Sequence, residues 1–227
     1  MNLLSRYMKL LRHYGPQGWW PTPYYRPGVY SRRFSERERF EICVGAILTQ
    51  NTAWKNVEKA IKCLKAAKLL NARAIAVSPL AKLQSCIRSS GYYKQKAKKL
   101  KIFSKWLIEK YGGNFARFCR RSTLVCRQKL LSLWGIGPET ADSMLLFAGH
   151  KPIFVIDAYT RRFLAEYGVR LGTYDEYQKY FMDKLPKSVS MYKEYHALIV
   201  AWGKDHKTRD VSEEASHKGT HGLVRAK

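Results

Sequence analysis

Apolar and polar side chains alternate with helical spacing along most of this chain. Between residues 2 and 13 the apolar positions recur every three or four residues, which is typical of one face of a helix. The same spacing predicts further helices at about residues 54–66, 80–88, 94–111, 123–132, 139–148, 157–167, 174–184 and 188–204.

One predicted helix is apolar on nearly every side. Ser35 and Glu38 have the spacing of a capping box, and the run from Phe40 to Leu48 follows them directly. A helix without a polar face is buried on all sides. We therefore expect this helix to lie at the centre of the fold.

Three segments break the helical pattern. Residues 15–30 are rich in Gly, Pro and aromatic side chains and predict an irregular segment. The apolar residues 152–156 would form a strand if taken alone, but helices on both sides favour an extended connector. Residues 205–227 are polar and are expected to be a disordered tail. The fold class predicted is all-α, in a single domain over residues 1–204.

The charge of the chain indicates a polyanionic partner. The 227 residues carry a formal net charge of +25 and a pI near 10.0. A basic protein with charged tails is the simpler interpretation, but the basic residues are distributed along the whole chain, which favours nucleic acid. No apolar run approaches the ~20 residues that cross a bilayer, and no signal peptide is apparent. A cytoplasmic, nucleoid-associated protein is expected.

The cysteines do not form a metal-binding pattern. Their spacing contains no Cys-x-x-Cys pair, so buried reduced thiols are expected rather than a disulfide framework or a zinc site. The five are Cys43, Cys63, Cys86, Cys119 and Cys126.

The most specific motif is a glycine hairpin between two helical runs. Gly135 and Gly137 flank Ile136, and a new helix begins at once through Pro138, Glu139 and Thr140. Glycine permits a tight turn and close approach of another backbone. The amides at the start of the second helix form a natural phosphate site.

The hairpin, followed about twenty residues later by Asp157, resembles the helix-hairpin-helix (endonuclease III-like) DNA glycosylase superfamily. The resemblance implies two helical lobes with an active-site cleft between them. The middle lobe would span about residues 50–152, and the N-terminal and C-terminal helices would form the other. Double-stranded DNA with damaged bases would be the partner of a monomeric enzyme.

Asp157 is the catalytic residue that the resemblance implies. Asp is also a favoured helix N-cap, and both roles can hold together. A carboxylate facing a cleft can stabilise the positive charge that develops as an N-glycosidic bond breaks, and can orient water.

Glu139 departs from the pattern of bifunctional relatives, which carry a lysine at this position. Glutamate cannot form a Schiff base with the sugar. The resemblance therefore implies a monofunctional glycosylase that leaves an abasic site, with weak or absent lyase activity. No cysteine follows Cys126, so the iron–sulfur loop of many relatives is missing. A monovalent cation, Na⁺ or K⁺, at the hairpin is compatible with the resemblance.

Three segments are similar to the 3-methyladenine DNA glycosylase III sub-family. They are Trp19-Trp20-Pro21, the run Gly45–Trp54, and the last helix from His196 to Lys204. The similarity places Trp20, Pro21, Trp54, Glu139 and Lys204 around the base pocket. Ordinary core packing is the alternative for the tryptophans, and a cation at a helix C-terminus is the alternative for Lys204.

Further residues are expected to contact DNA. Gln50 lies where the family fills the gap left by an extruded base, although a loop residue fits equally well. Tyr92 or Tyr93 resembles the strand wedge of the family. Lys94, Lys96, Lys98 and Lys99 give a cationic helix start that suits phosphates, although a solvated helix face explains them too. Gly135, Ile136, Gly137 and Thr140 would hold the phosphate at the hairpin.

These features favour base excision of alkylated purines, chiefly of the 3-methyladenine type. Another lesion or a mismatched base is the alternative within the same chemistry. Removal of adenine opposite oxidised guanine is weaker, because such relatives carry an iron–sulfur loop and an extra domain. A non-enzymatic duplex-binding module is the alternative of a different class.

Overall fold

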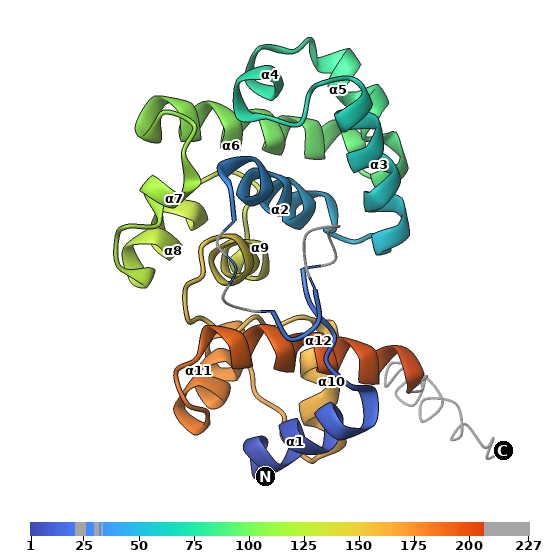
Figure 1. Cartoon of the computed structure of the whole chain (residues 1–227), viewed down its shortest axis with the longest axis vertical. Helices are drawn as coiled ribbons and strands as arrows, with labels where there is room; N and C mark the ends of the chain where they lie inside the picture. The colour runs from blue at the N-terminus through green and yellow to red at the C-terminus, as the bar shows by residue number, and fades with distance from the viewer. Residues whose placement is uncertain (21–25, 30–31, 33, 207–227) are drawn as a thin grey trace, which may run out of the picture.

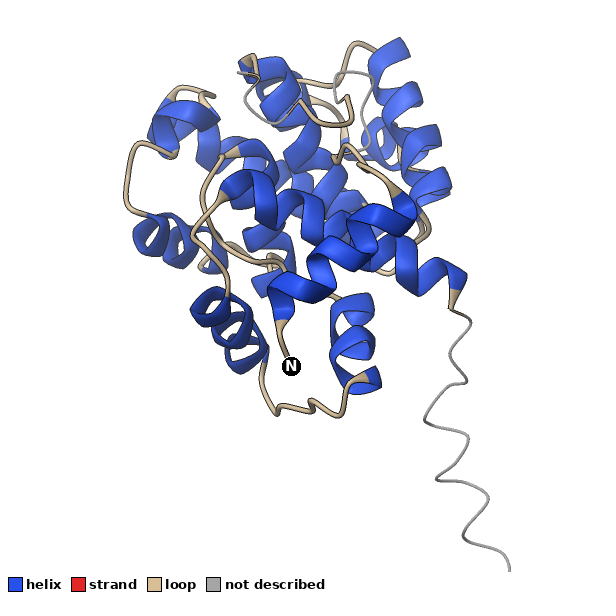
Figure 2. Ribbon diagram, turned by 60° about the horizontal axis from the view of Figure 1, so that its bottom comes forward, coloured by secondary structure: helices blue, strands red, loops and turns tan. Residues whose placement is uncertain are grey.

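The computed structural model describes residues 1–20, 26–29, 32 and 34–206, and these residues are helical or irregular throughout. Helices fall into two groups, one above the other (Figure 1). Figure 2 shows the same described residues as helices joined by loops. The all-α fold class predicted from the sequence is therefore confirmed.

The upper group in Figure 1 surrounds one central helix. Its members are α2 (Glu36–Leu48), α3 (Trp54–Ala66), α4 (Ala72–Val77), α5 (Leu80–Cys86), the 3₁₀ turn η1 (Arg88–Ser90), α6 (Tyr93–Tyr111), α7 (Phe115–Phe118), α8 (Thr123–Leu131), α9 (Pro138–Ser143) and the π turn η2 (Met144–Ala148).

The lower group joins the two ends of the described chain. The hydroxyl of Tyr195 donates to the carbonyl of Leu3 at 3.0 Å, which fixes the N-terminal helix against the C-terminal one. The members are α1 (Leu3–Tyr14), α10 (Ala158–Glu166), α11 (Tyr174–Lys184) and α12 (Val189–Asp205).

The central helix α2 begins and packs as its sequence predicts. Ser35 and Glu38 form the reciprocal capping box, and every side chain from Phe40 to Leu48 is buried. The expected lobe boundary differs, however. Because α2 packs against α3, α6 and α7, the upper lobe begins near residue 36 rather than near residue 50.

Several predicted elements differ in length. The helix expected over 139–148 is α-helical only to Ser143 and then takes a π turn, and the helix expected over 80–88 divides into α5 and η1. The short helices α4 and α7 were not predicted, because segments of six and four residues are too short to show a periodicity. The expected tail, beyond residue 206, lies outside the described residues. Among the helices of the described part, none is long and apolar enough to span a bilayer.

Candidate active site

Asp157 is held at both oxygens at the start of α10. Its Oδ1 accepts hydrogen bonds from the backbone N–H of Thr160 at 2.7 Å and from the Thr160 hydroxyl at 2.9 Å. Its Oδ2 lies 3.3 Å from Nε2 of His196 on α12. The side chain is 14% exposed. The N-cap interpretation of Asp157 is therefore confirmed.

A polar network fixes the extended connector that leads to Asp157. Gln178 donates to the Phe154 carbonyl at 2.6 Å, and the N–H of Ile156 donates to the Tyr174 hydroxyl at 3.2 Å. Gln178 also donates to the buried carboxylate of Asp142 at 2.8 Å. Since Asp142 lies in the helix that follows the hairpin, the network links the hairpin to the connector.

The two carboxyl groups of the site have different protonation properties. Burial raises the pKa of Asp157, but the charge and contact of His196 and the two donors of Thr160 outweigh burial and hold the pKa below its usual value. Glu139 is exposed at the start of α9, and partial desolvation of its carboxyl group, with the negative charge of Asp157, raises its pKa to about 7. Near neutral pH one carboxyl group is ionised and the other is partly protonated.

Aromatic side chains pack around His196 and the start of α3. Trp20 makes edge contacts with Trp54, at a centroid distance of 5.4 Å, and a tilted contact with Phe147, at 5.1 Å. The Trp20 side chain is 4% exposed and packs in the core, which agrees with the alternative that the sequence left open. Trp54 is half-buried, and its indole N–H donates to Glu58. Pro21 lies outside the described residues.

A groove of about 880 Å³ runs along the hairpin. Gln50 crosses from the end of α2 to the hairpin, where Nε2 donates to the Gly135 carbonyl at 3.1 Å and to the Thr140 hydroxyl at 2.9 Å. The groove is lined by Gln50, Asn51, Lys99, Leu131–Thr140 and Tyr174. Gln50 thus connects the end of α2 to the hairpin through its side chain, which an ordinary loop residue would not do.

The hairpin residues predicted to hold phosphate have unequal exposure. Gly137 is exposed and is the N-cap of α9, with Pro138 at the first helical position. Ile136 and Thr140 are buried, so their side chains do not face solvent. Gly135 has a φ of +83°, which only glycine adopts without strain. An added Cβ there would lie 2.6 Å from the Lys99 side chain.

The other residues predicted to contact DNA differ in their exposure to solvent. Tyr92 is 67% exposed and Lys94 is exposed. The prediction that Lys96 faces phosphate is wrong, because its ammonium group is buried and donates to the carbonyls of Leu48 and Ser90. Lys204 is exposed in the last turn of α12, and no described hydrogen bond or ion pair joins it to Asp157.

Metal-ligating residues do not cluster in the described part of the chain. No group of three or more His, Cys, Asp or Glu side chains there could hold a metal ion, and the cysteines are free thiols. At the hairpin, the Gly135 carbonyl already accepts from Gln50, and the Lys99 stem packs against the glycine. Because a carbonyl oxygen has two lone pairs, this contact does not decide the expected monovalent cation at the hairpin, which stays a prediction.

The motif order and the geometry agree with one family. A model of the HhH-GPD superfamily of base excision DNA repair proteins matches residues 44–187, which are 144 of the 227 residues. The chain belongs to the HhH-GPD superfamily. The match includes α2 from Val44 onward, the hairpin, Asp157 and α11.

Relatives of this HhH-GPD protein include repair glycosylases. A protein of Methanocaldococcus jannaschii assigned to the DNA repair glycosylases is 45% identical over 198 residues, covering 86% of this chain and 83% of that protein. Endonuclease III of Thermotoga maritima is 29% identical over 161 residues, covering 70% and 71%.

Solved structures share the fold of this HhH-GPD protein. A 3-methyladenine DNA glycosylase of H. pylori, bound to 1,N6-ethenoadenine, has a TM-score of 0.73 at 30% identity, covering 89% of this chain and 95% of that one. A trapped endonuclease III–DNA covalent intermediate has a TM-score of 0.71 at 21% identity, covering 92% and 89%. The chain is therefore a DNA glycosylase of the HhH-GPD family, with a fold that binds DNA.

Two site residues of this HhH-GPD protein escaped the sequence interpretation. The sequence shows His196 only as the start of a family-like segment, and Lys99 only as one of several lysines. His196 is separated from Asp157 by 39 positions, and Lys99 donates to Gln50 across 49 positions at 2.5 Å. A buried histidine on an apolar helix was the one available signal, because a polar side chain there needs a partner.

Proposed function

We propose that this glycosylase is monofunctional and removes alkylated purines of the 3-methyladenine type from duplex DNA. Water supplies the oxygen that bonds to C1′ of the sugar, the C1′–N bond breaks, and the base leaves with the bonding electrons. The product is an abasic site in an intact strand. The single observation that carries the proposal is the oriented, ionised Asp157 beside an aromatic cluster and Glu139.

Asp157 would act on the charge that develops during bond breaking. Its carboxylate is ionised and held in one orientation, so it needs little reorganisation to stabilise an oxocarbenium-like sugar. A ring-alkylated purine is already cationic and is a good leaving group. The reaction therefore needs little protonation of the base, and binding in an aromatic pocket becomes the larger requirement.

The aromatic cluster would receive the extruded base. Stacking on an aromatic face contributes about 1–3 kcal/mol per base, which helps to offset the few kcal/mol needed for unstacking. Trp54 is the better candidate for this contact, because it is half-buried whereas Trp20 supports it from the core. The ethenoadenine bound to the H. pylori relative supports a pocket for modified adenines in this chain.

Glu139 supports base release without strand cleavage. It stands in the first turn of α9, and its carboxyl group is close enough to Asp157 for its pKa to respond to that charge. A carboxyl group cannot attack C1′ to give an imine, so water remains the nucleophile.

The test is to incubate the protein with methylated DNA and with duplexes that each contain one lesion or mismatch. We expect 3-methyladenine to be the main base detected by chromatography, with the strand intact until alkali is added. Borohydride should trap no covalent adduct, which would exclude every lysine as nucleophile. A strong adduct, or release confined to an unalkylated base, would contradict the proposal.

A further inference from the structure

His196 is a buried imidazole enclosed by aromatic rings. It is 4% exposed, and its ring makes edge contacts with Trp19 at a centroid distance of 5.6 Å and with Phe147 at 5.8 Å. Neither ring nitrogen makes a hydrogen bond among the described residues. Nε2 faces Asp157 at 3.3 Å. Burying an imidazole in such apolar surroundings costs free energy unless the ring interacts with a polar or charged partner.

The two oxygens of Asp157 are held by different elements. Thr160 in the first turn of α10 binds Oδ1 with two donors, which is an ordinary local cap. Oδ2 is instead contacted from α12, a helix that reaches the site from the far end of the chain. A cap alone needs only the first contact, so the second contact has another purpose.

We propose that His196 is a positioning residue for base release, and that its imidazole holds Oδ2 of Asp157 while Thr160 holds Oδ1. The inference rests on the proposed function of Asp157. With both oxygens held, the carboxylate meets the extruded nucleotide in one orientation. His196 acts through Asp157 and need not touch the base or the sugar. The arrangement is similar in logic to the carboxylate–imidazole pairs that orient catalytic groups in other enzymes.

The neighbouring charges make the contribution of His196 measurable. Burial alone would raise the pKa of Asp157, and His196 is the main group that opposes it, ahead of Thr160. Glu139 on α9 is the other titrating group beside the pair, and Arg161 on α10 faces Glu139. Among the described residues of η2 and the N-terminal segment, the uncharged rings of Phe147 and Trp19 lie against His196. Without His196, the effect of burial should therefore dominate and raise the pKa of Asp157.

The first measurement is an NMR titration of the Asp157 side-chain carboxyl carbon, assigned with Asp157→Asn. In His196→Phe, which keeps a ring but removes the nitrogen, we expect the pKa of Asp157 to rise by about one to three pH units, the range associated with a nearby opposite charge. His196→Gln, which keeps a donor without charge, should give a smaller rise. The matched control is His13→Phe, because His13 is exposed on α1 and should leave this pKa unchanged.

The second measurement is the single-turnover rate of base release from pH 5 to 8. In His196→Phe the acidic limb should move to higher pH by the same one to three pH units, and below the shifted pKa the rate should fall about tenfold for each pH unit. If His196→Phe does not fold, His196→Gln carries the same two measurements. The inference would be overturned if the His196 variants kept the wild-type pKa of Asp157 and the wild-type pH profile while Asp157→Asn was inactive. Release by Asp157→Asn would instead overturn the proposed function.

Discussion

At the scale of single residues, two lysines two positions apart in α6 have opposite exposure to solvent. Lys94 is exposed near the exposed Tyr92, whereas Lys96 is 1% exposed. Its ammonium group donates to the carbonyls of Leu48 at 2.8 Å and Ser90 at 2.6 Å, which joins α2 and η1 to α6. Burial, with the charge of Lys99, lowers the pKa of Lys96 to about 8. Composition alone would count both side chains as phosphate contacts.

Substitution of the two lysines by methionine should separate stability from DNA affinity. Lys96→Met leaves two buried carbonyls without their donor and should lower the free energy of unfolding by roughly 1–3 kcal/mol, measured by urea denaturation. Lys94→Met should leave stability unchanged and weaken duplex binding, with a salt slope smaller by about one, measured by fluorescence anisotropy. Equal effects of the two variants on both measurements would contradict this assignment.

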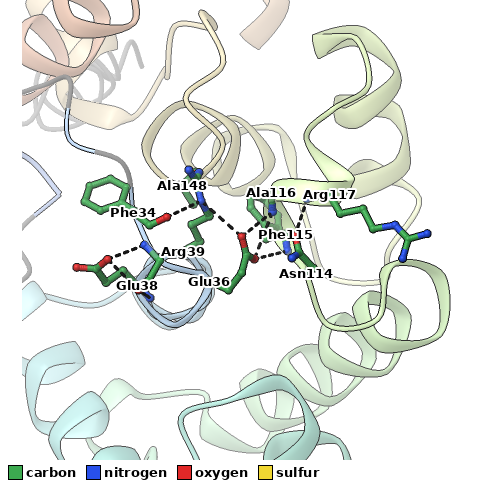
Figure 3. A network of polar contacts seen from close by, with 10 residues as sticks. Phe34, Glu36, Glu38, Arg39, Asn114, Phe115, Ala116, Arg117 and Ala148 are labelled. Carbon is green, nitrogen blue, oxygen red and sulfur yellow. Dashed lines mark hydrogen bonds and ion pairs between the residues drawn. The ribbon is translucent and has the colours of Figure 1, made fainter.

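At the scale of elements, α2 and α7 are joined by a carboxylate rather than by sequence proximity (Figure 3). Glu36 accepts hydrogen bonds from the N–H groups of Phe115 at 2.7 Å and Ala116 at 3.2 Å, so it caps a helix some eighty positions away. The neighbouring Arg39 donates to the carbonyls of Phe34 and Ala148. The first turn of α2 thus fixes α7, η2 and its own approach segment.

Glu36→Ala should weaken the connection between α2 and α7. The N-terminal amides of α7 lose their acceptor, and we expect the protein to lose about 0.5–2 kcal/mol of stability, the usual cost of removing a helix cap. Thermal or urea unfolding measures the loss. Glu109→Ala removes the same side chain from an exposed position on α6 and is the matched control. A stability equal to that of the control would show that the α7 amides are satisfied without Glu36.

At the scale of the whole molecule, the site forms because the lower lobe is closed by the two ends of the described chain. Besides the contact of Tyr195 with Leu3, the N–H of Gln17 donates to Glu194 at 2.6 Å. These contacts fix α12 to the N-terminal segment, and the packing of α12 against α10 brings His196 to Asp157. The hairpin, fixed to the connector through Asp142 and Gln178, forms the other side of the site.

The sequence predicted what depends on local pattern. Helical periodicity predicted most of the helices, and the Ser35–Glu38 spacing predicted the cap of α2. The hairpin and Asp157 together indicated the family. Burial of Lys96 and Trp20, the Gln50–Lys99 contact and the approach of His196 depend on packing between distant segments. No periodicity encodes these contacts, so they required the structure.

The central claim is that Asp157 carries base release in a glycosylase whose nucleophile is water. The most direct measurement compares wild type and Asp157→Asn on a duplex with one 3-methyladenine, recording base release and duplex affinity on the same preparations. We predict that release by Asp157→Asn falls at least a hundredfold, as loss of a positioned charge-stabilising group does, with affinity within about threefold of wild type. Release by Asp157→Asn at the wild-type rate would contradict the account.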